Sequence, residues 1–136
     1  QLKLNIMEWY LKVMRDNYAN FNGRARRKEY WMYTLILTVL LIALMAIMFS
    51  ALSLSDETRI ETGPSGYLTV LLLFVFLVVH FIPSLALTVR RLHDTGKSGW
   101  WYLIVFVPYL GNFVIFIFTL IDGDEGENKY GPNPKL

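Results

Sequence analysis

The sequence contains no cysteine, and three long stretches of it contain no charge. The absence of cysteine excludes disulfides, iron–sulfur clusters and thiolate zinc sites. Charged residues make up 18% of the chain, whereas a soluble domain has about a quarter. The stretches 31–55, 62–89 and 98–121 hold no Asp, Glu, Lys or Arg, and each exceeds the roughly 18 apolar residues typical of a membrane helix. A soluble bundle would need three helices that are apolar on all sides, so the sequence predicts an all-α integral membrane protein.

The basic residues are unevenly distributed over the polar segments. Residues 1–30 hold seven Lys or Arg against three acids, and residues 90–97 hold three against one, whereas residues 56–61 hold one against three. Positive charge accumulates on the cytoplasmic side of membrane proteins. The pattern therefore predicts a multi-pass protein whose N-terminus and second basic segment face the cytoplasm.

The uncharged runs at residues 31–54 and 67–89 predict two firm transmembrane helices. Residues 1–6 precede the first methionine and are expected to be an expression remnant, which leaves 7–136 as a single membrane domain. Within it, residues 7–20 place apolar and charged side chains on opposite helix faces, which predicts an amphipathic helix in the membrane interface. A solvated helix that packs on the loops stays open as an alternative.

The last apolar run, residues 100–121, is compatible with two structures. It is long enough for a third span, which would place the polar tail, 122–136, on the far side of the membrane. Pro108, Gly111 and Asn112 interrupt the run in its middle, however, and two half-length pieces could form a re-entrant hairpin that returns the tail to the cytoplasm. A membrane tolerates such broken segments only where they are buried in protein or line a cavity. Both structures stay open.

A polar stripe runs along one face of the second predicted span and consists of His80, Ser84 and Thr88. Pro83 lies beside the stripe, and its ring leaves the carbonyl group of Val79 without its helical partner. Polar side chains within a membrane face the protein interior or a wet cavity. The stripe therefore predicts either hydrogen bonds between helices or the path of a small oligomeric transporter.

Cations and tryptophans gather at the predicted cytoplasmic boundary. The predicted anion- or lipid-binding residues are Arg24, Arg26, Arg27, Arg90, Arg91 and Lys97. The predicted interface anchors are Trp9, Trp31, Trp100 and Trp101. Each cation near the surface contributes about 1 kcal/mol of attraction to anionic lipid, and tryptophan prefers the headgroup level. His93 and Asp94 are expected to orient the loop between the basic segments. The sequence predicts no metal site, no cofactor and no nucleic-acid interface.

Three segments stand out by composition and order: FNGRARRKEYW at 21–31, RRLHDTGKSGWW at 90–101 and GENKYGPNP at 126–134. They resemble the signature motifs of a bacterial inner-membrane family known as domain of unknown function 805. The resemblance covers the chain from Met7 onward and implies a small polytopic protein of the bacterial inner membrane. It brings no established activity, so no catalytic residues are carried over. It also implies that the three motifs share one side of the membrane, which would favour the hairpin.

The sequence favours a non-enzymatic membrane protein whose basic, aromatic cytoplasmic face binds anionic phospholipid headgroups or an acidic partner. A small oligomeric transporter or channel that uses the polar stripe is the first alternative. The second is an enzyme that acts on a lipid-linked substrate through His93 and Asp94. Adjacent residues rarely point at one substrate, and the sequence carries no hydrolase or kinase motif. Self-association as a homo-oligomer stays open.

Overall fold

The computed structural model describes residues 5–53 and 64–136, and all its named elements are helices. In chain order they are α1 (Ile6–Leu11), η1 (Lys12–Asp16), α2 (Arg27–Ser53), α3 (Pro64–Asp94), η2 (Gly99–Phe106) and α4 (Leu110–Leu120). The predicted all-α class is confirmed. Residues 1–4 of the expected remnant, and most of the polar connection predicted after residue 54, lie outside the described residues.

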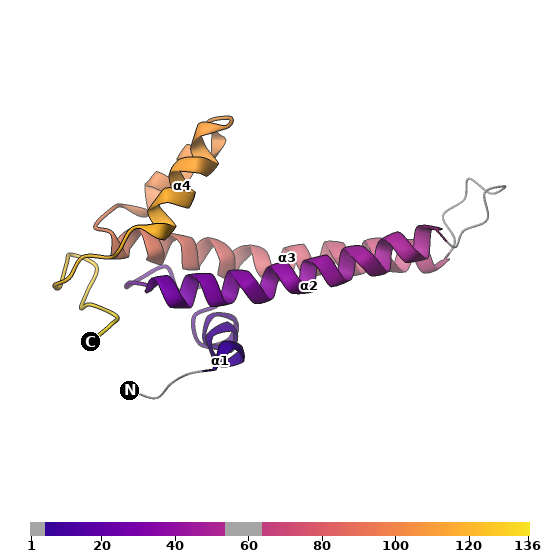
Figure 1. Cartoon of the computed structure of the whole chain (residues 1–136), viewed down its shortest axis with the longest axis horizontal. Helices are drawn as coiled ribbons and strands as arrows, with labels where there is room; N and C mark the ends of the chain where they lie inside the picture. Colours follow the sequence, from indigo (N-terminus) through magenta and orange to yellow (C-terminus); the bar gives the residue numbers. More distant parts are fainter. Residues whose placement is uncertain (1–4, 54–63) are drawn as a thin grey trace.

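The helices α2 and α3 form one long antiparallel pair (Figure 1). The start of α2, the end of α3 and residues 121–136 lie together at one end of this pair, which we call the base. α1 and α4 also lie near the base, on different sides of the pair. Among the described residues, the charged side chains of α2, α3 and the tail are therefore concentrated at the base, and the rest of the two long helices is apolar.

Both long helices have the length and composition of membrane helices, as predicted. With 27 and 31 residues, α2 and α3 are about 40 and 46 Å long, against a hydrocarbon core of about 30 Å. Their apolar side chains point outward: Ile42, Phe49 and Phe74 are 63%, 73% and 63% exposed. Contiguous apolar surface on this scale is typical of a helix that faces lipid.

The two helices extend beyond the predicted spans into the base. α2 begins at Arg27 instead of residue 31, and α3 continues to Asp94 instead of ending at 89. α3 then ends in a Schellman motif, because Gly96 adopts a φ of 71° and the N–H of Lys97 donates to the carbonyl of Leu92 at 3.0 Å. Residues predicted to lie in a loop are thus helical, since the base supplies partners for their charges.

The third apolar run forms a broken hairpin and not a third span (Figure 1). η2 and α4 are each about 16 Å long, because 3₁₀- and α-helices rise about 2.0 and 1.5 Å per residue. Gly111 permits their close packing, since a Cβ atom on it would lie 1.8 Å from the carbonyl oxygen of Ile104. Tyr109 turns the chain with a φ of 63°. The N–H of Asp124 then donates to the carbonyl of Asp94 at 2.8 Å, so the tail returns to the base.

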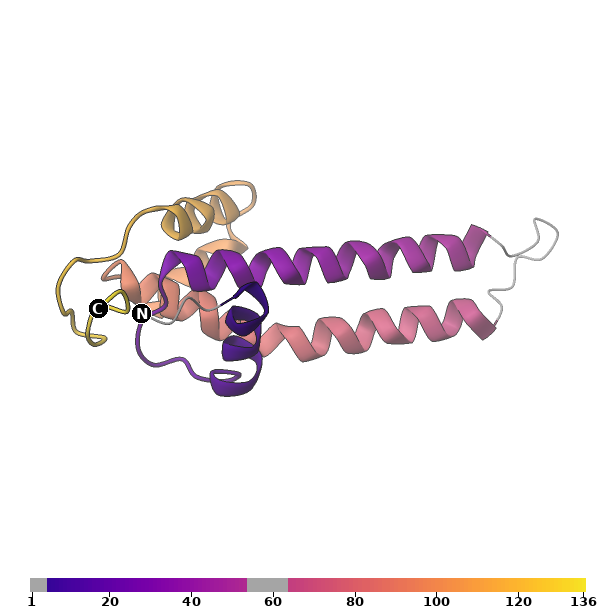
Figure 2. The same cartoon turned by 60° about the horizontal axis from the view of Figure 1, so that its bottom comes forward.

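The N-terminal helices α1 and η1 lie across α2 and α3 near the base (Figure 2). Val13 is fully buried in a small core with Ala25, Tyr33 and Leu87. The helical segment ends at Asp16, four residues before the predicted end of this helix at residue 20. One face of the amphipathic segment therefore packs against the two long helices.

Candidate functional site

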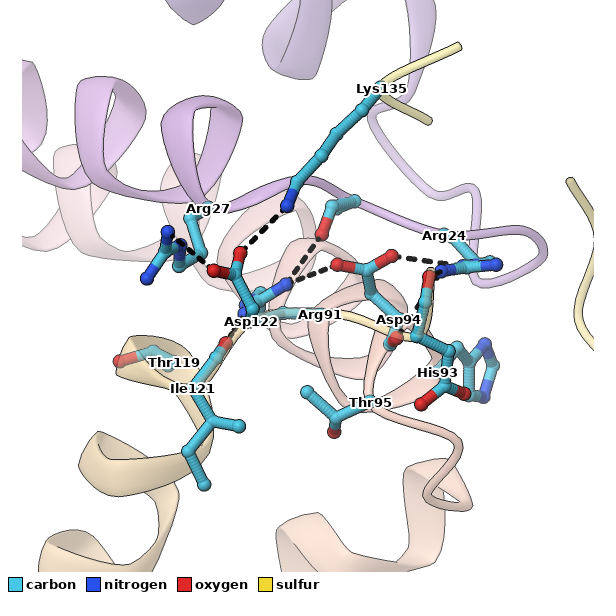
Figure 3. A network of polar contacts seen from close by, with 12 residues as sticks. Arg24, Arg27, Arg91, His93, Asp94, Thr95, Thr119, Ile121, Asp122 and Lys135 are labelled. Atoms are coloured by element: carbon cyan, nitrogen blue, oxygen red, sulfur yellow. Dashed lines mark hydrogen bonds and ion pairs between the residues drawn. The ribbon is translucent and has the colours of Figure 1, made fainter. Parts of the chain in front are cut away.

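Asp94, the last residue of α3, is the centre of a buried ion cluster in the base. Its carboxylate accepts hydrogen bonds from Nε of Arg24, at 2.9 Å, and from Nη1 of Arg91. The side chains of Arg24, Arg91 and Asp94 are 1%, 0% and 2% exposed. Figure 3 shows the two guanidinium groups reaching the carboxylate from two sides. Arg91 also donates to the carbonyl oxygens of Ala25 and Ile121, which helps to offset the excess positive charge.

Arg24 also binds the polar tail. Its Nη2 donates to the carbonyl oxygen of Asp124 at 2.6 Å, and its Nη1 donates to those of Gly126 at 2.7 Å and Gly131 at 3.2 Å. A planar guanidinium has five N–H donors and no acceptor, so it suits a turn of backbone carbonyls. One side chain from the segment before α2 thus holds the end of the chain against the end of α3.

His93 joins the same segments of the base. Its ring stacks on Tyr130 with the centroids 3.8 Å apart, and its Nδ1 lies 3.2 Å from the carbonyl oxygen of Gly23. The carbonyl oxygen of His93 accepts a hydrogen bond from Nδ2 of Asn128 at 3.0 Å. The three sequence motifs, far apart in the chain, therefore meet at the base. His93 and Asp94 have separate partners, which is not the geometry of a base oriented by its neighbouring acid.

An exposed ion cluster lies beside the buried one (Figure 3). Asp122 accepts a hydrogen bond from Nζ of Lys135 at 2.7 Å and lies 2.9 Å from Nη2 of Arg27. The hydrogen bond from Lys135 and the positive charge of Arg27 hold the pKa of Asp122 below its ordinary value. Exposed pairs of this kind contribute little to stability. This cluster therefore adds little to the free energy that holds the tail at the base.

Glu29, in the first turn of α2, is the centre of a second buried ion cluster, the Glu29 cluster. Its carboxylate accepts hydrogen bonds from Nη1 of Arg90 at 2.8 Å and from Nζ of Lys12 at 2.7 Å. The side chains of Glu29 and Arg90 are 1% and 4% exposed, while that of Lys12 is 38% exposed. Lys12 is therefore the outward-facing member of this cluster.

Trp9 of α1 adjoins the Glu29 cluster. Its side chain is covered by the protein and is only 5% exposed, and its role as an interface anchor stays a prediction. Three cations cover its ring, with Lys12, Arg26 and Lys28 at 5.2, 5.3 and 5.9 Å from the centroid. Cation–π contacts draw the indole inward, so Trp9 joins α1 to the start of α2.

Several buried N–H groups of these clusters have no hydrogen-bond partner among the described residues. They are Nε and Nη2 of Arg90, Nε of Arg91 and Nε1 of Trp9. A buried donor without a partner costs about 1–3 kcal/mol. Nε and Nη2 of Arg90 form one edge of the planar guanidinium, and such an edge can bind an oxyanion through two parallel hydrogen bonds. Glu29 thus binds Nη1 of Arg90, while the edge formed by Nε and Nη2 is free.

An open groove lies between the start of α2 and the end of α4. Arg27, Lys28, Trp31 and Leu120 line it, and its volume is about 460 Å³. The indole Nε1 of Trp31 donates to the carbonyl oxygen of Thr119 at 3.3 Å, which fixes the ring as one wall. The groove combines two exposed cations with apolar walls at the boundary between the charged base and the apolar helices.

Tyrosines from the N-terminal half contact the polar stripe of α3. The hydroxyl of Tyr10 lies 2.8 Å from Nε2 of His80, and that of Tyr33 lies 3.0 Å from Oγ of Ser84. Thr88 donates to the carbonyl oxygen of Ser84 in its own helix. Burial raises the pKa of the Tyr10 hydroxyl, which therefore stays protonated. Each side chain of the stripe has a partner within the chain.

Tyr18 satisfies the carbonyl group that the proline leaves free. Pro83 lies inside α3 and has no N–H to donate to the carbonyl of Val79. The hydroxyl of Tyr18 donates to this oxygen at 2.7 Å. The segment after η1 is thereby docked on α3 one turn before Pro83.

The structure separates the cations that the sequence grouped into one anion site. Those that are buried and bound to internal groups are Arg24, Arg90 and Arg91. Those that reach the surface are Arg26, Arg27 and Lys97, of which Lys97 lies 4.5 Å from the ring centroid of Phe118. Trp100 and Trp101 are 78% and 48% exposed. Lipid binding by any of these residues stays a prediction.

The residues that sequence reasoning missed are Lys12, Glu29, Tyr10, Tyr18 and Tyr33. Glu29 had a usable signal, because it is a lone acid directly after a run of cations at a membrane boundary. Such an acid needs a buried cation as its partner. The tyrosines had no comparable signal, since their partners lie in a distant helix.

The chain is similar to a protein family and to several Escherichia coli proteins. The family model described as "Protein of unknown function (DUF805)" matches residues 18–132. The Escherichia coli K12 "Inner membrane protein YhaI" is 43% identical over 96% of this chain and 98% of that protein. "Inner membrane protein YhaH" of the same organism is 39% identical over the same shares. "Uncharacterized protein YiiR" is 30% identical over 82% of this chain and 84% of that protein. No solved structure matches.

Proposed function

We propose that this chain, which belongs to the DUF805 family, is an inner membrane protein that binds anionic phospholipid headgroups at its base. The groove of Arg27, Lys28, Trp31 and Leu120 carries the proposal. A lipid phosphate would contact the two cations, and the first carbons of the acyl chain would lie on the apolar walls. Cations at this level attract anionic lipid by about 1 kcal/mol each.

The placement in the membrane follows from the same features. Relatives named as inner membrane proteins support the compartment, and the positive charge of the base supports a cytoplasmic base. The two long helices would cross the bilayer. The hairpin, about 16 Å deep, would reach only about half of the hydrocarbon core. Its exposed side chains, such as Phe106 at 80% and Leu110 at 65%, would then contact the acyl chains of the inner leaflet.

The polar stripe supports this proposal better than a transport path. His80 and Ser84 are hydrogen-bonded to tyrosines from other segments of the chain, so they hold the helices together. A substrate path would need these groups turned toward a cavity. The groove, in contrast, is open to the surroundings and combines exposed cations with apolar walls, which suits a headgroup.

The replacement Lys28→Gln tests the groove. Purified protein in a mixture of phosphatidylglycerol and phosphatidylethanolamine should retain less phosphatidylglycerol in native mass spectrometry, because one of the two groove cations is lost. Lys129→Gln is the matched control, since Lys129 is also exposed but lies in the tail, outside the groove. Equal retention by the wild type and Lys28→Gln, or an equal loss in both variants, would contradict the proposal.

A further inference from the structure

We propose a second anion site, in the Glu29 cluster, where the free edge of Arg90 binds a phosphate group. This site is distinct from the groove: it is buried beneath α1 and η1, and it uses a different arginine. The phosphate would come from a lipid headgroup or from free phosphate in the cytoplasm. The chemistry of recognition is the same for both.

The charge of the cluster calls for an anion. Two cations, Lys12 and Arg90, share the single carboxylate of Glu29, so the cluster carries a net positive charge. Like charges held this close repel one another, and burial strengthens the repulsion. A bound anion would relieve it.

The free donors of the cluster define the ligand further. Nε and Nη2 of Arg90 and Nε1 of Trp9 are buried N–H groups without a partner among the described residues. All three are donors, so the ligand must be an acceptor. A phosphate group can accept both hydrogen bonds of the Arg90 edge in the bidentate geometry that guanidinium groups favour, and it keeps at least one further oxygen for another donor.

Arg90 is held ready for such a ligand. Glu29 binds its Nη1 at 2.8 Å, and Lys12 holds the other oxygen of Glu29 at 2.7 Å. The backbone is also fixed, because the carbonyl oxygen of Arg90 accepts a hydrogen bond from the N–H of Ala25 at 3.0 Å. Binding to a guanidinium already fixed in position loses little entropy.

Lys12 is where a phosphate group would enter. Its side chain is 38% exposed, whereas Glu29 and Arg90 are nearly fully buried. α1 and η1, which cover the cluster, are short helices of 6 and 5 residues. Movement of the flexible lysine stem would open the way to the Arg90 edge without unfolding α2 or α3.

The test is a titration of the ¹⁵N-labelled full chain in maltoside micelles, which contain no phosphate. One arm adds inorganic phosphate, and the other adds short-chain phosphatidylglycerol. The Trp9 indole N–H resonance, assigned by its loss in Trp9→Phe, and an arginine Nε–H resonance should move in at least one arm. A response to inorganic phosphate identifies free phosphate as the ligand, and a response to lipid alone identifies a headgroup.

Two variants locate the site. Arg90→Lys keeps the charge and the pairing with Glu29 but loses the two-donor edge, so half-saturation should need a roughly tenfold higher phosphate concentration. Arg26→Lys is the matched control, since it makes the same change beside the same indole and should titrate like the wild type.

If Arg90→Lys fails to fold, the wild-type titration alone tests the site. Resonances that stay unmoved in both arms would overturn the proposal, as would an Arg90→Lys variant that titrates like the wild type. Arg27→Gln, which removes a groove cation that pairs with Asp122 and not with Glu29, should leave this titration intact, which separates the buried site from the groove.

Discussion

A charged side chain buried at the end of a membrane helix needs a partner, and Asp94 has two. Arg24 and Arg91 neutralise it from separate segments, and all three side chains are almost completely buried. Removing one member of such a cluster leaves the others charged and unpaired in a medium of low polarity, which is far more costly than losing an exposed pair. The charge balance of the base therefore contributes to stability whether or not the base binds a ligand.

The variant Asp94→Asn should lower the free energy of unfolding by about 3–5 kcal/mol, because both arginines stay buried without a counter-charge. Unfolding in detergent, followed by circular dichroism, measures the change. Asp122→Asn is the control, since Asp122 pairs with Arg27 and Lys135 at the surface and its loss should have little effect. Similar effects of the two variants would show that the Asp94 cluster is not the anchor of the base.

Among the elements, α3 has the carbonyl group to which the N-terminal segment binds. Pro83 breaks the hydrogen-bond ladder of the helix, and Tyr18 fills the position of the missing donor with its hydroxyl, 2.7 Å from the carbonyl oxygen of Val79. A free carbonyl in a membrane helix is normally satisfied by a neighbouring helix or side chain. The proline therefore creates a specific attachment point on an otherwise apolar surface.

The hydrogen bond of Tyr18 should be coupled to Pro83. Tyr18→Phe should cost about 0.5–1.5 kcal/mol in the wild type, and almost nothing in a Pro83→Ala background, where the N–H of residue 83 can donate to Val79. A double-mutant cycle of unfolding free energies measures this coupling. Tyr109→Phe is the control, because the Tyr109 side chain is 94% exposed. Equal costs of Tyr18→Phe in both backgrounds would contradict the docking role.

At the scale of the whole molecule, the base joins three segments into one structure. Arg24, Asp94 and the tail carbonyls are connected by short hydrogen bonds, and the hairpin brings the tail back to where η2 began. A third span would have separated the tail from Arg24 by the thickness of the membrane. The hairpin is therefore a precondition of the contacts between Arg24 and the tail.

This topology predicts the labelling of single cysteines, which the natural absence of cysteine makes possible. In whole cells, a membrane-impermeant maleimide should label Ser53→Cys, at the end of α2, and should not label Ser98→Cys or Leu136→Cys. The last two residues lie at the base with the proposed cytoplasmic side. Permeabilised cells provide the control, since all three sites should then react. Labelling of Leu136→Cys in intact cells would place the tail outside and rule out this arrangement in the membrane.

The local features of this protein could be predicted from its sequence. Hydropathy and charge are properties of consecutive residues, so the two long helices, the polar stripe and the break near Pro108 were visible without a fold. The free carbonyl beside Pro83 was also predictable, because it follows from the chemistry of one residue. The ends of the helices were predicted less accurately. The last turn of α3, which ends at Asp94, is charged, and its partners lie in distant segments of the chain.

The long-range features depended on the tertiary structure. Arg24 lies 70 positions from Asp94, and Tyr10 lies 70 positions from His80, so no local pattern links them. The same holds for the choice between a span and a hairpin, which Gly111 and the contacts of the tail determine. An arginine that binds lipid and one that neutralises a buried acid look alike in a sequence. They differ in burial, and burial is set by which segments the fold brings together.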